Sequence, residues 1–397
     1  MREWHPYRIK DIVQLVSIKS EDLTLPYIAL DNIISWDATF VPSDSATDGN
    51  SNLCEAGDVL FGKLRPYLAK AYIPTETSIC SPEFLVLRPN KGTNNKFLLY
   101  FLLSKSFISH IRNQVAGVKM PRTNWSQISC YPILMPSPDE QETIAEYLDK
   151  ECEKIGRNIE LLERKADAYK RLRRSIINRA VTRGLNPDVP LKPSGNDWIG
   201  DIPAHWRIER NKNLLTESKE TVGDDNSYQL LSLTLNGVII RDLDGGGKFP
   251  AEFNTYKKVH PNNLIFCLFD MDETPRTIGL SAHKGMITGA YDVFDAIPDV
   301  VIPKWVYYFY FCIDQRKALK PYYTGLRKVV KTQNFANIHI PVPPLEEQKE
   351  IVAYLDEKCG KIDAIIEKIG TQIERMKELK RSLINEVVTG KRAIINQ

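Results

Sequence analysis

The feature that most constrains the fold is a stretch that the chain contains twice. Residues 139–182 recur without a gap at an offset of 207 positions, so that Gln141 corresponds to Gln348 and Asn178 to Asn385. Internal self-similarity of this kind is an architectural signal. Two copies are too few for a solenoid, so the sequence predicts a duplicated unit.

Within each copy, apolar residues recur at alternating steps of three and four. A narrow apolar stripe over about five heptads is typical of a coiled-coil seam. About 40 residues at 1.5 Å each make a helix of roughly 60 Å, which needs a partner stripe. The alternative is two unrelated long surface helices. We expect the two copies to pack against each other through Ile144, Leu148, Ile155, Ile159, Leu162, Tyr169, Leu172, Ile351, Leu355, Ile362, Ile366, Ile369, Ile373, Met376 and Leu379.

Length and composition set broad bounds. The chain has 397 residues, enough for two or three domains, and a formal net charge of only +3. Its longest apolar runs are too short to span a bilayer, and its start lacks the apolar core of a signal peptide. Seven scattered cysteines argue against a disulfide framework. We expect a soluble, cytoplasmic protein.

The two long helices divide the chain into two mixed domains. We expect a first domain at 1–138, a helix at 139–183 capped by Asp139, a Pro/Gly linker at 184–197, a second domain at 198–343 and a helix at 344–390. The second domain repeats the plan of the first, since a helix expected at 96–113 is echoed at 304–311. The predicted fold class is α+β, with two diverged mixed domains joined by two long antiparallel helices in a pseudo-two-fold arrangement.

The sequence contains no catalytic motif that stands out. The run at 245–249 lacks the spacing and hydroxyl of a phosphate-binding loop, and there is no glycine-rich cofactor turn after a strand. The six histidines never fall at metal-ligand spacing with cysteine or carboxylates, so we expect no metal site. Acidic pairs at the two helix starts are explained by the helix dipole.

Binding loops are the remaining functional feature. Residues 63–70, 117–125 and 325–335 mix basic, amide and aromatic side chains in turn-rich stretches. Arginine and lysine suit guanine edges and phosphates, and amides suit adenine edges, although a basic loop is often merely solvated. The candidate DNA-binding residues are Lys63, Arg65, Lys70, Lys119, Arg122, Asn124, Trp125, Arg276, Arg327, Lys328, Lys331, Gln333 and Asn334.

Taken together, the motifs resemble the specificity subunit of type I restriction–modification enzymes over nearly the whole chain. The residues that carry the resemblance are the doubled Glu-Gln helix start followed by Tyr-Leu-Asp, the run Arg-Ser-Ile-Ile-Asn-Arg-Ala-Val-Thr-Arg-Gly-Leu-Asn-Pro at 174–187, and Trp-Ile-Gly-Asp-Ile-Pro-Ala-His-Trp at 198–206.

The resemblance implies a non-catalytic subunit with two target-recognition domains, each reading one half of a split, asymmetric DNA sequence. It also implies docking of two methyltransferase subunits and of motor–nuclease subunits, with S-adenosylmethionine, ATP and magnesium bound by those partners and no cofactor bound by this chain. A coiled-coil assembly scaffold without nucleic acid is the alternative, and a single-chain methyltransferase or nuclease is disfavoured by the missing motifs.

Overall fold

The computed structural model describes residues 4–20, 22–45, 49–115, 120–223, 227–241 and 253–394. The chain forms two compact units, one of residues 1–164 with 369–397 and the other of residues 165–368. Each unit contains one mixed domain and a part of each of two long helices, α5 (Pro138–Arg183) and α8 (Leu345–Val388).

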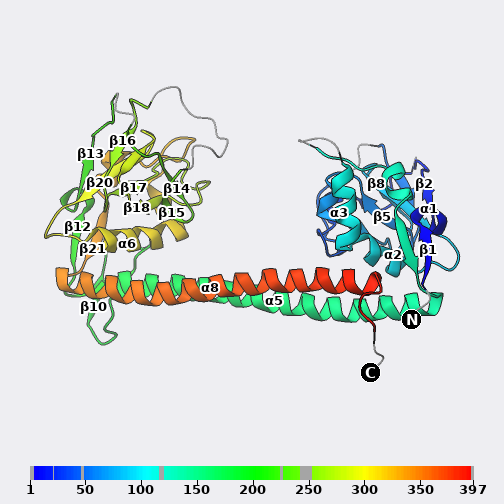
Figure 1. The fold of residues 1–397 in the computed structure, drawn as a ribbon. Coiled ribbons are helices and arrows are strands. Elements are labelled where there is room, and N and C mark those ends of the chain that lie inside the picture. The colour runs from blue at the N-terminus through cyan, green and yellow to red at the C-terminus, as the bar shows by residue number, and fades with distance from the viewer. Residues whose placement is uncertain are drawn as a thin grey trace. The chain divides into compact units, whose positions relative to one another are not determined.

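The two long helices run antiparallel where they meet within each unit (Figure 1). In the first unit, Ile144 and Leu148 at the start of α5 share a buried core with Leu383 and Val387 at the end of α8. In the second unit, Val181 of α5 belongs to the same core as the first turns of α8. The predicted antiparallel arrangement of the duplicated helices is therefore present.

Most of the expected seam is buried, but the prediction is wrong at one position of each copy. Leu172 and its counterpart Leu379 are 48% and 54% exposed. The residues one step further on turn inward instead, with the Arg173 and Lys380 side chains only 22% and 9% exposed. A straight helix has 3.6 residues per turn, so its inward face drifts away from a strict heptad pattern.

The other predicted seam positions are buried or half-buried. The buried ones are Ile144, Leu148, Ile155, Ile351, Leu355, Ile362, Ile369 and Ile373, and the half-buried ones are Ile159, Leu162, Tyr169, Ile366 and Met376.

The first domain is built on a four-stranded antiparallel sheet in the order β2-β8-β5-β6. Apolar side chains are buried on both faces of this sheet: Phe61 and Leu85 belong to one core cluster, and Leu60 and Val86 belong to another. Its elements are β1 (His5–Arg8), α1 (Ile9–Ile12), β2 (Val13–Val16), β3 (Tyr27–Ile28), η1 (Leu30–Asn32), β4 (Asn52–Cys54), β5 (Val59–Gly62), η2 (Pro66–Leu68), β6 (Ala71–Tyr72), β7 (Ser78–Cys80), β8 (Phe84–Pro89), α2 (Asn95–Leu102), α3 (Lys105–Gln114), α4 (Trp125–Ser129) and β9 (Pro132–Met135).

The second domain repeats this sheet as β13-β20-β17-β18, again antiparallel throughout. Its plan therefore repeats that of the first domain, as predicted. The elements are β10 (Leu191–Pro193), β11 (Asp201–Pro203), β12 (Arg207–Arg210), η3 (Asn211–Asn213), β13 (Leu215–Ser218), β14 (Leu231–Thr234), β15 (Gly237–Ile240), β16 (Lys257–Val259), β17 (Leu264–Phe266), β18 (Ile278–Leu280), β19 (Gly285–Ile287), β20 (Asp292–Ala296), α6 (Pro303–Arg316), η4 (Lys320–Tyr322), α7 (Thr332–Ala336) and β21 (His339–Val342).

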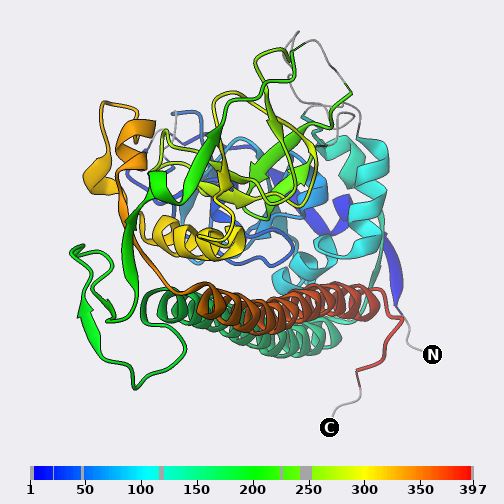
Figure 2. The ribbon, with the colours of Figure 1, turned by 90° about the vertical axis from the view of Figure 1, so that its left-hand side faces the viewer.

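In the second unit, α6 lies between this sheet and the long helices, as Figure 2 shows from the side. Its aromatic residues enter one core with the sheet and with α8, and Trp305 and Phe309 are fully buried. The expected helix at 304–311 is therefore present and joins the sheet to the helix pair.

Two local expectations in the first unit are wrong. The stretch expected as one helix at 96–113 is two helices, because the buried Ser104 side chain accepts the Phe107 N–H and caps α3. The cap of α5 is Ser137 rather than Asp139, since the Ser137 hydroxyl accepts the Glu140 N–H at 3.3 Å. Pro138 then fits the first helical position, which needs no N–H donor.

A buried glutamine fastens each domain to the start of a long helix. The Gln141 side-chain oxygen accepts the Asn94 N–H at 2.8 Å, and its amide donates to the carbonyls of Gly92 and Pro136. Gln348 repeats all three bonds in the second unit, with the Ile302 N–H and the carbonyls of Val300 and Pro343. We call this arrangement the glutamine clamp.

A carboxylate two turns further along each helix makes the second fixed contact. Asp149 accepts the Tyr100 hydroxyl at 2.7 Å and pairs with Lys96 at 2.6 Å. In the second unit Asp356 accepts the Tyr308 hydroxyl at 2.6 Å and pairs with Lys304 at 2.7 Å. Burial, and then the bond to the carboxylate, raise the pKa of both tyrosines, so both donate as neutral phenols.

No helix in the described part of the chain combines the length and the apolar character needed to cross a lipid bilayer.

The glutamine clamp makes a stability prediction. Gln348 is fully buried, and replacing it with Ala leaves one N–H and two carbonyls without partners. We expect Gln348→Ala to lower the free energy of unfolding by about 2–4 kcal/mol, since an orphaned buried polar group costs about 1–3 kcal/mol. Urea denaturation followed by circular dichroism measures this. Gln372→Ala, at an exposed position of the same helix, is the matched control, and equal midpoints for the two variants would contradict the clamp.

Candidate nucleic-acid interface

The two basic stretches of the first domain lie side by side. The Arg65 N–H donates to the Pro121 carbonyl at 2.8 Å, and the Thr123 N–H donates to the Lys63 carbonyl at 3.0 Å. One stretch, 63–70, follows β5, and the other, 120–125, leads into α4. We call them together the first paired loop.

The second domain builds the same arrangement. The Asp270 N–H donates to the Arg327 carbonyl at 2.8 Å, and the Val330 N–H donates to the Leu268 carbonyl at 2.8 Å. The stretch 267–272 follows β17, and the stretch 324–334 leads into α7. These two stretches are the second paired loop.

The two paired loops share an unusual backbone conformation. The backbone N–H groups of Arg65 and Asp270 donate equivalent hydrogen bonds, and the two residues have φ angles of 48° and 47°. A left-handed backbone is uncommon for a residue with a Cβ and persists only where the surroundings hold it. The same strained frame therefore carries an arginine in one domain and an aspartate in the other.

The cations of the first paired loop differ in their exposure and in whether they form an ion pair. Arg65 is exposed and has no ion pair within the described residues, and Lys63 is half-buried. Arg122 is exposed and pairs with Glu83, Nε to carboxylate oxygen at 3.1 Å. Lys119, also predicted to bind DNA, lies outside the described residues.

Three other predicted residues of the first domain have structural partners. The Lys70 ammonium donates to the Leu30 carbonyl at 2.7 Å, and burial lowers its pKa. The Asn124 side chain accepts the Gln127 N–H at 3.1 Å and so caps α4. Trp125 is half-buried against the core. A contact of these three residues with DNA stays a prediction.

In the second paired loop, carboxylates hold the two central cations. Arg327 pairs with Asp270 at 2.6 Å, and its guanidinium lies 5.4 Å from the centroid of the Phe269 ring. Lys328 pairs with Asp272 at 2.9 Å. The hydrogen bonds from these cations lower the pKa of both carboxyls, so both pairs stay charged at neutral pH.

The remaining predicted residues of the second domain are divided between two places. Lys331, Gln333 and Asn334 are exposed at the start of α7, beside the paired loop. Arg276 is elsewhere: its guanidinium lies 4.3 Å from the centroid of the Phe311 ring and donates to the Leu235 carbonyl. It lines a hollow of about 400 Å³ beside α5 and α6, so it is not part of the paired loop.

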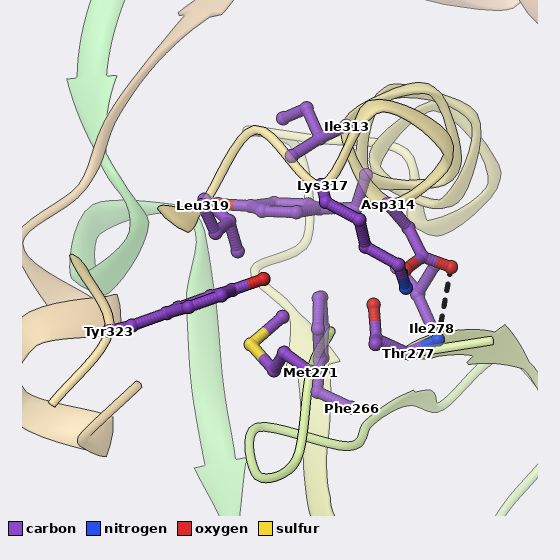
Figure 3. Close-up of a pocket in the computed structure, with 10 residues that line it drawn as sticks. Phe266, Met271, Thr277, Ile278, Ile313, Asp314, Lys317, Leu319 and Tyr323 are labelled. Atoms are coloured by element: carbon purple, nitrogen blue, oxygen red, sulfur yellow. Dashed lines mark hydrogen bonds and ion pairs between the residues drawn. The ribbon is translucent and has the colours of Figure 1, made fainter. Parts of the chain in front are cut away.

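A buried carboxylate anchors the stretch that carries Asp270 and Asp272. Asp314 of α6 accepts the Thr277 N–H at 3.0 Å and the Lys317 ammonium at 2.8 Å, and Lys317 also donates to the Thr274 carbonyl. Figure 3 shows Asp314, Lys317 and Thr277 close together, with the Tyr323 ring on the other side of the cavity. The cavity among them is about 10 Å³, room for about one water molecule, so it serves packing rather than ligand binding.

The sequence-based search found the cations but missed their counter-ions. Glu83, Asp270 and Asp272 determine which cations of the paired loops form ion pairs. The only indication of these pairs in the sequence is the two aspartates at alternate positions after Phe269. Among the described residues, no group of three or more His, Cys, Asp or Glu side chains could hold a metal ion. The geometry therefore supports binding of a ligand through polar side chains on the two paired loops, which share one backbone arrangement.

Comparisons with known proteins agree with this geometry. The family model for the type I restriction modification DNA specificity domain matches residues 1–165 and 293–375. The MjaVIII type I restriction enzyme specificity subunit of Methanocaldococcus jannaschii is 21% identical, covering 99% of this chain and 94% of that protein. The EcoBI specificity subunit of Escherichia coli is 21% identical, covering 80% of this chain and 70% of that one.

A solved chain of a type I R-M system, from work on its complex assembly and conformational transition, has the same fold. Its TM-score is 0.70 at 16% identity, with 98% of both chains covered. Since the family model matches more than half of the residues, the chain belongs to the type I restriction–modification DNA specificity family, whose members recognise DNA and are not catalytic subunits.

Proposed function

We propose that this chain reads a split, asymmetric DNA sequence, with one half-site for each domain and one paired loop at each half-site. The observation that carries the proposal is the duplicated frame with different side chains. Arg65 in the first domain and Asp270 in the second occupy the same strained position. Arginine donates hydrogen bonds and aspartate accepts them, so two such loops suit different base edges.

The long helices support the assignment of one domain to each half-site. Each domain is fixed to its helix by the same glutamine clamp and by the same tyrosine–aspartate contact. The contacts that mount the domains are thus kept, while the loops that they carry differ. This pattern is expected when both domains attach to the helices in the same way but bind different DNA half-sites.

Methyltransferase subunits are the proposed partners on the helices. Leu161, Leu172 and Leu379 are 59%, 48% and 54% exposed on α5 and α8. Leu172 and Leu379 are equivalent positions of the duplication, so each copy offers the same apolar residue to one of two identical subunits. We propose that two methyltransferase subunits dock here, that motor–nuclease subunits join the same complex, and that the partners bind S-adenosylmethionine, ATP and magnesium.

The proposal predicts that methylation depends on the partners. Purified chain mixed with S-adenosylmethionine and duplex DNA should transfer no methyl group, and addition of the methyltransferase subunit from the same genome should give methylation at one split sequence. Sequencing of methylated sites in DNA treated with each mixture measures this. Methyl transfer by the chain alone would contradict the proposal.

DNA binding by the chain–methyltransferase complex distinguishes a DNA-recognition subunit from a scaffold that does not bind nucleic acid. Binding of duplex DNA by the chain–methyltransferase complex should weaken steeply with salt, because phosphate contacts release counterions. A chain that joined the partner but added neither affinity nor sequence preference would be a scaffold without nucleic acid.

Side-chain replacement in one paired loop should alter one half-site only. We expect Arg122→Gln to relax base preference in one half and Arg327→Gln in the other, since a base-edge contact is worth about 1–3 kcal/mol of discrimination. Methylation-site sequencing of each variant complex gives the base preference at every position. Arg157→Gln, at an exposed position of α5, is the control. Equal loss in both halves would assign these arginines to phosphate contact instead.

A further inference from the structure

Each paired loop carries one apolar side chain that is more than half exposed. Leu326 is 102% exposed, the highest value among the large apolar residues described, and Met120 is 59% exposed. Single exposed apolar residues are common on protein surfaces and by themselves need no explanation. What distinguishes these two is their position in the paired loops.

Met120 and Leu326 occupy equivalent positions relative to the bond that the left-handed residue donates, although the second loop has one more residue between its two inter-stretch bonds. Pro121 and Arg327 accept the equivalent hydrogen bonds from the left-handed residues Arg65 and Asp270. Met120 directly precedes Pro121, and Leu326 directly precedes Arg327. Both domains therefore place a flexible apolar side chain, methionine or leucine, directly before the residue that accepts this hydrogen bond, although their loop sequences differ.

The backbone around Leu326 is held in a tight hairpin. Thr324 and Val329 exchange backbone hydrogen bonds of 2.9 and 3.0 Å, and the Lys328 N–H donates to the Gly325 carbonyl at 3.2 Å. Gly325 has a φ of 68°, and a Cβ added there would meet open space, so glycine serves the backbone turn rather than packing. The turn leaves the Leu326 side chain fully exposed to water, so it gains no free energy from apolar burial.

The cations beside the apolar residue are tied down. Arg327 and Lys328 are paired with Asp270 and Asp272, and in the first domain Arg122 is paired with Glu83. Each apolar side chain is thus followed, one or two residues along the chain, by a cation that is held in an ion pair. A two-stranded element that carries polar and apolar side chains fits the major groove, where the one apolar group on a base edge is the thymine methyl.

We propose that Leu326 and Met120 each contact a thymine methyl in the major groove and so specify an A·T pair, one in each half-site. The proposal rests on the split-site function above and adds to it an apolar contact in each domain. It also gives a reason for exposing a leucine completely: burial against a methyl group returns free energy only on the correct base pair.

Duplexes with single thymine-to-uracil replacements test the proposal, because uracil pairs like thymine but lacks the methyl group. The probes carry the split sequence that methylation-site sequencing finds for the wild-type complex, and binding of the chain–methyltransferase complex is measured by fluorescence anisotropy. Leu326→Ala is expected to weaken binding about tenfold without changing the salt slope. One thymine-to-uracil replacement in one half-site should weaken the wild-type complex by a similar factor and leave the Leu326→Ala complex unaffected. Met120→Ala should behave likewise in the other half-site.

Leu235→Ala is the matched control, because Leu235 is 62% exposed between β14 and β15 of the same domain. Unchanged binding by Leu326→Ala, the same loss with Leu235→Ala, or a loss that no uracil replacement reproduces would each overturn the thymine contact. Those results leave the split-site function standing if the wild-type complex methylates one split sequence. Absence of any such sequence would overturn the proposed function itself.

Discussion

The mounting of each domain depends on a buried amide at the start of a long helix. The hydrophobic effect is non-directional, so it specifies the orientation of a domain on its helix less sharply than hydrogen bonds do. The glutamine clamp removes this freedom, because Gln141 and Gln348 must each meet one donor and two acceptors at fixed angles. In a dry site these bonds are strong when complete and costly when broken, so the loop before α2 or α6 is locked to the helix start.

The duplication explains why the helices retain their sequence while the domains have diverged. Each helix contributes its first part to one unit and its last part to the other, so every mounting position is used twice. Asn385 accepts the Ser106 N–H and hydroxyl in the first unit, whereas its counterpart Asn178 accepts from Cys312 and Arg316 in the second. Buried polar contacts inside a domain, such as the bonds from Asn211 to the Tyr310 hydroxyl and the Phe335 carbonyl, are used once and have no counterpart that must be kept on the helices.

The sequence predicted what periodicity and duplication determine. The long helices, their antiparallel pairing and the shared plan of the domains follow from regular apolar spacing, and the structure confirms them. The errors arose where one side chain decides the outcome. Ser104 breaks an otherwise continuous helical pattern by capping α3, and Leu172 leaves the seam because the true helical period exceeds that of a heptad. The counter-ions Asp270 and Asp272 lie far from Arg327 in sequence, so only the fold brings them together.

Those counter-ions bear on how the paired loops could discriminate among sequences. A free arginine or lysine binds any phosphate, and such contacts add affinity without sequence information. Arg327 and Lys328 already have carboxylate partners, so exchanging them for phosphates gains little free energy. A base edge that satisfies both the cation and its carboxylate gains more, because aspartate accepts a hydrogen bond where arginine donates one. If the paired loops bind DNA as proposed, neutralised ion pairs on a strained backbone favour contacts with bases over contacts with phosphates. The remaining affinity then comes from partner subunits and from cations such as Arg65, which has no ion pair within the described residues.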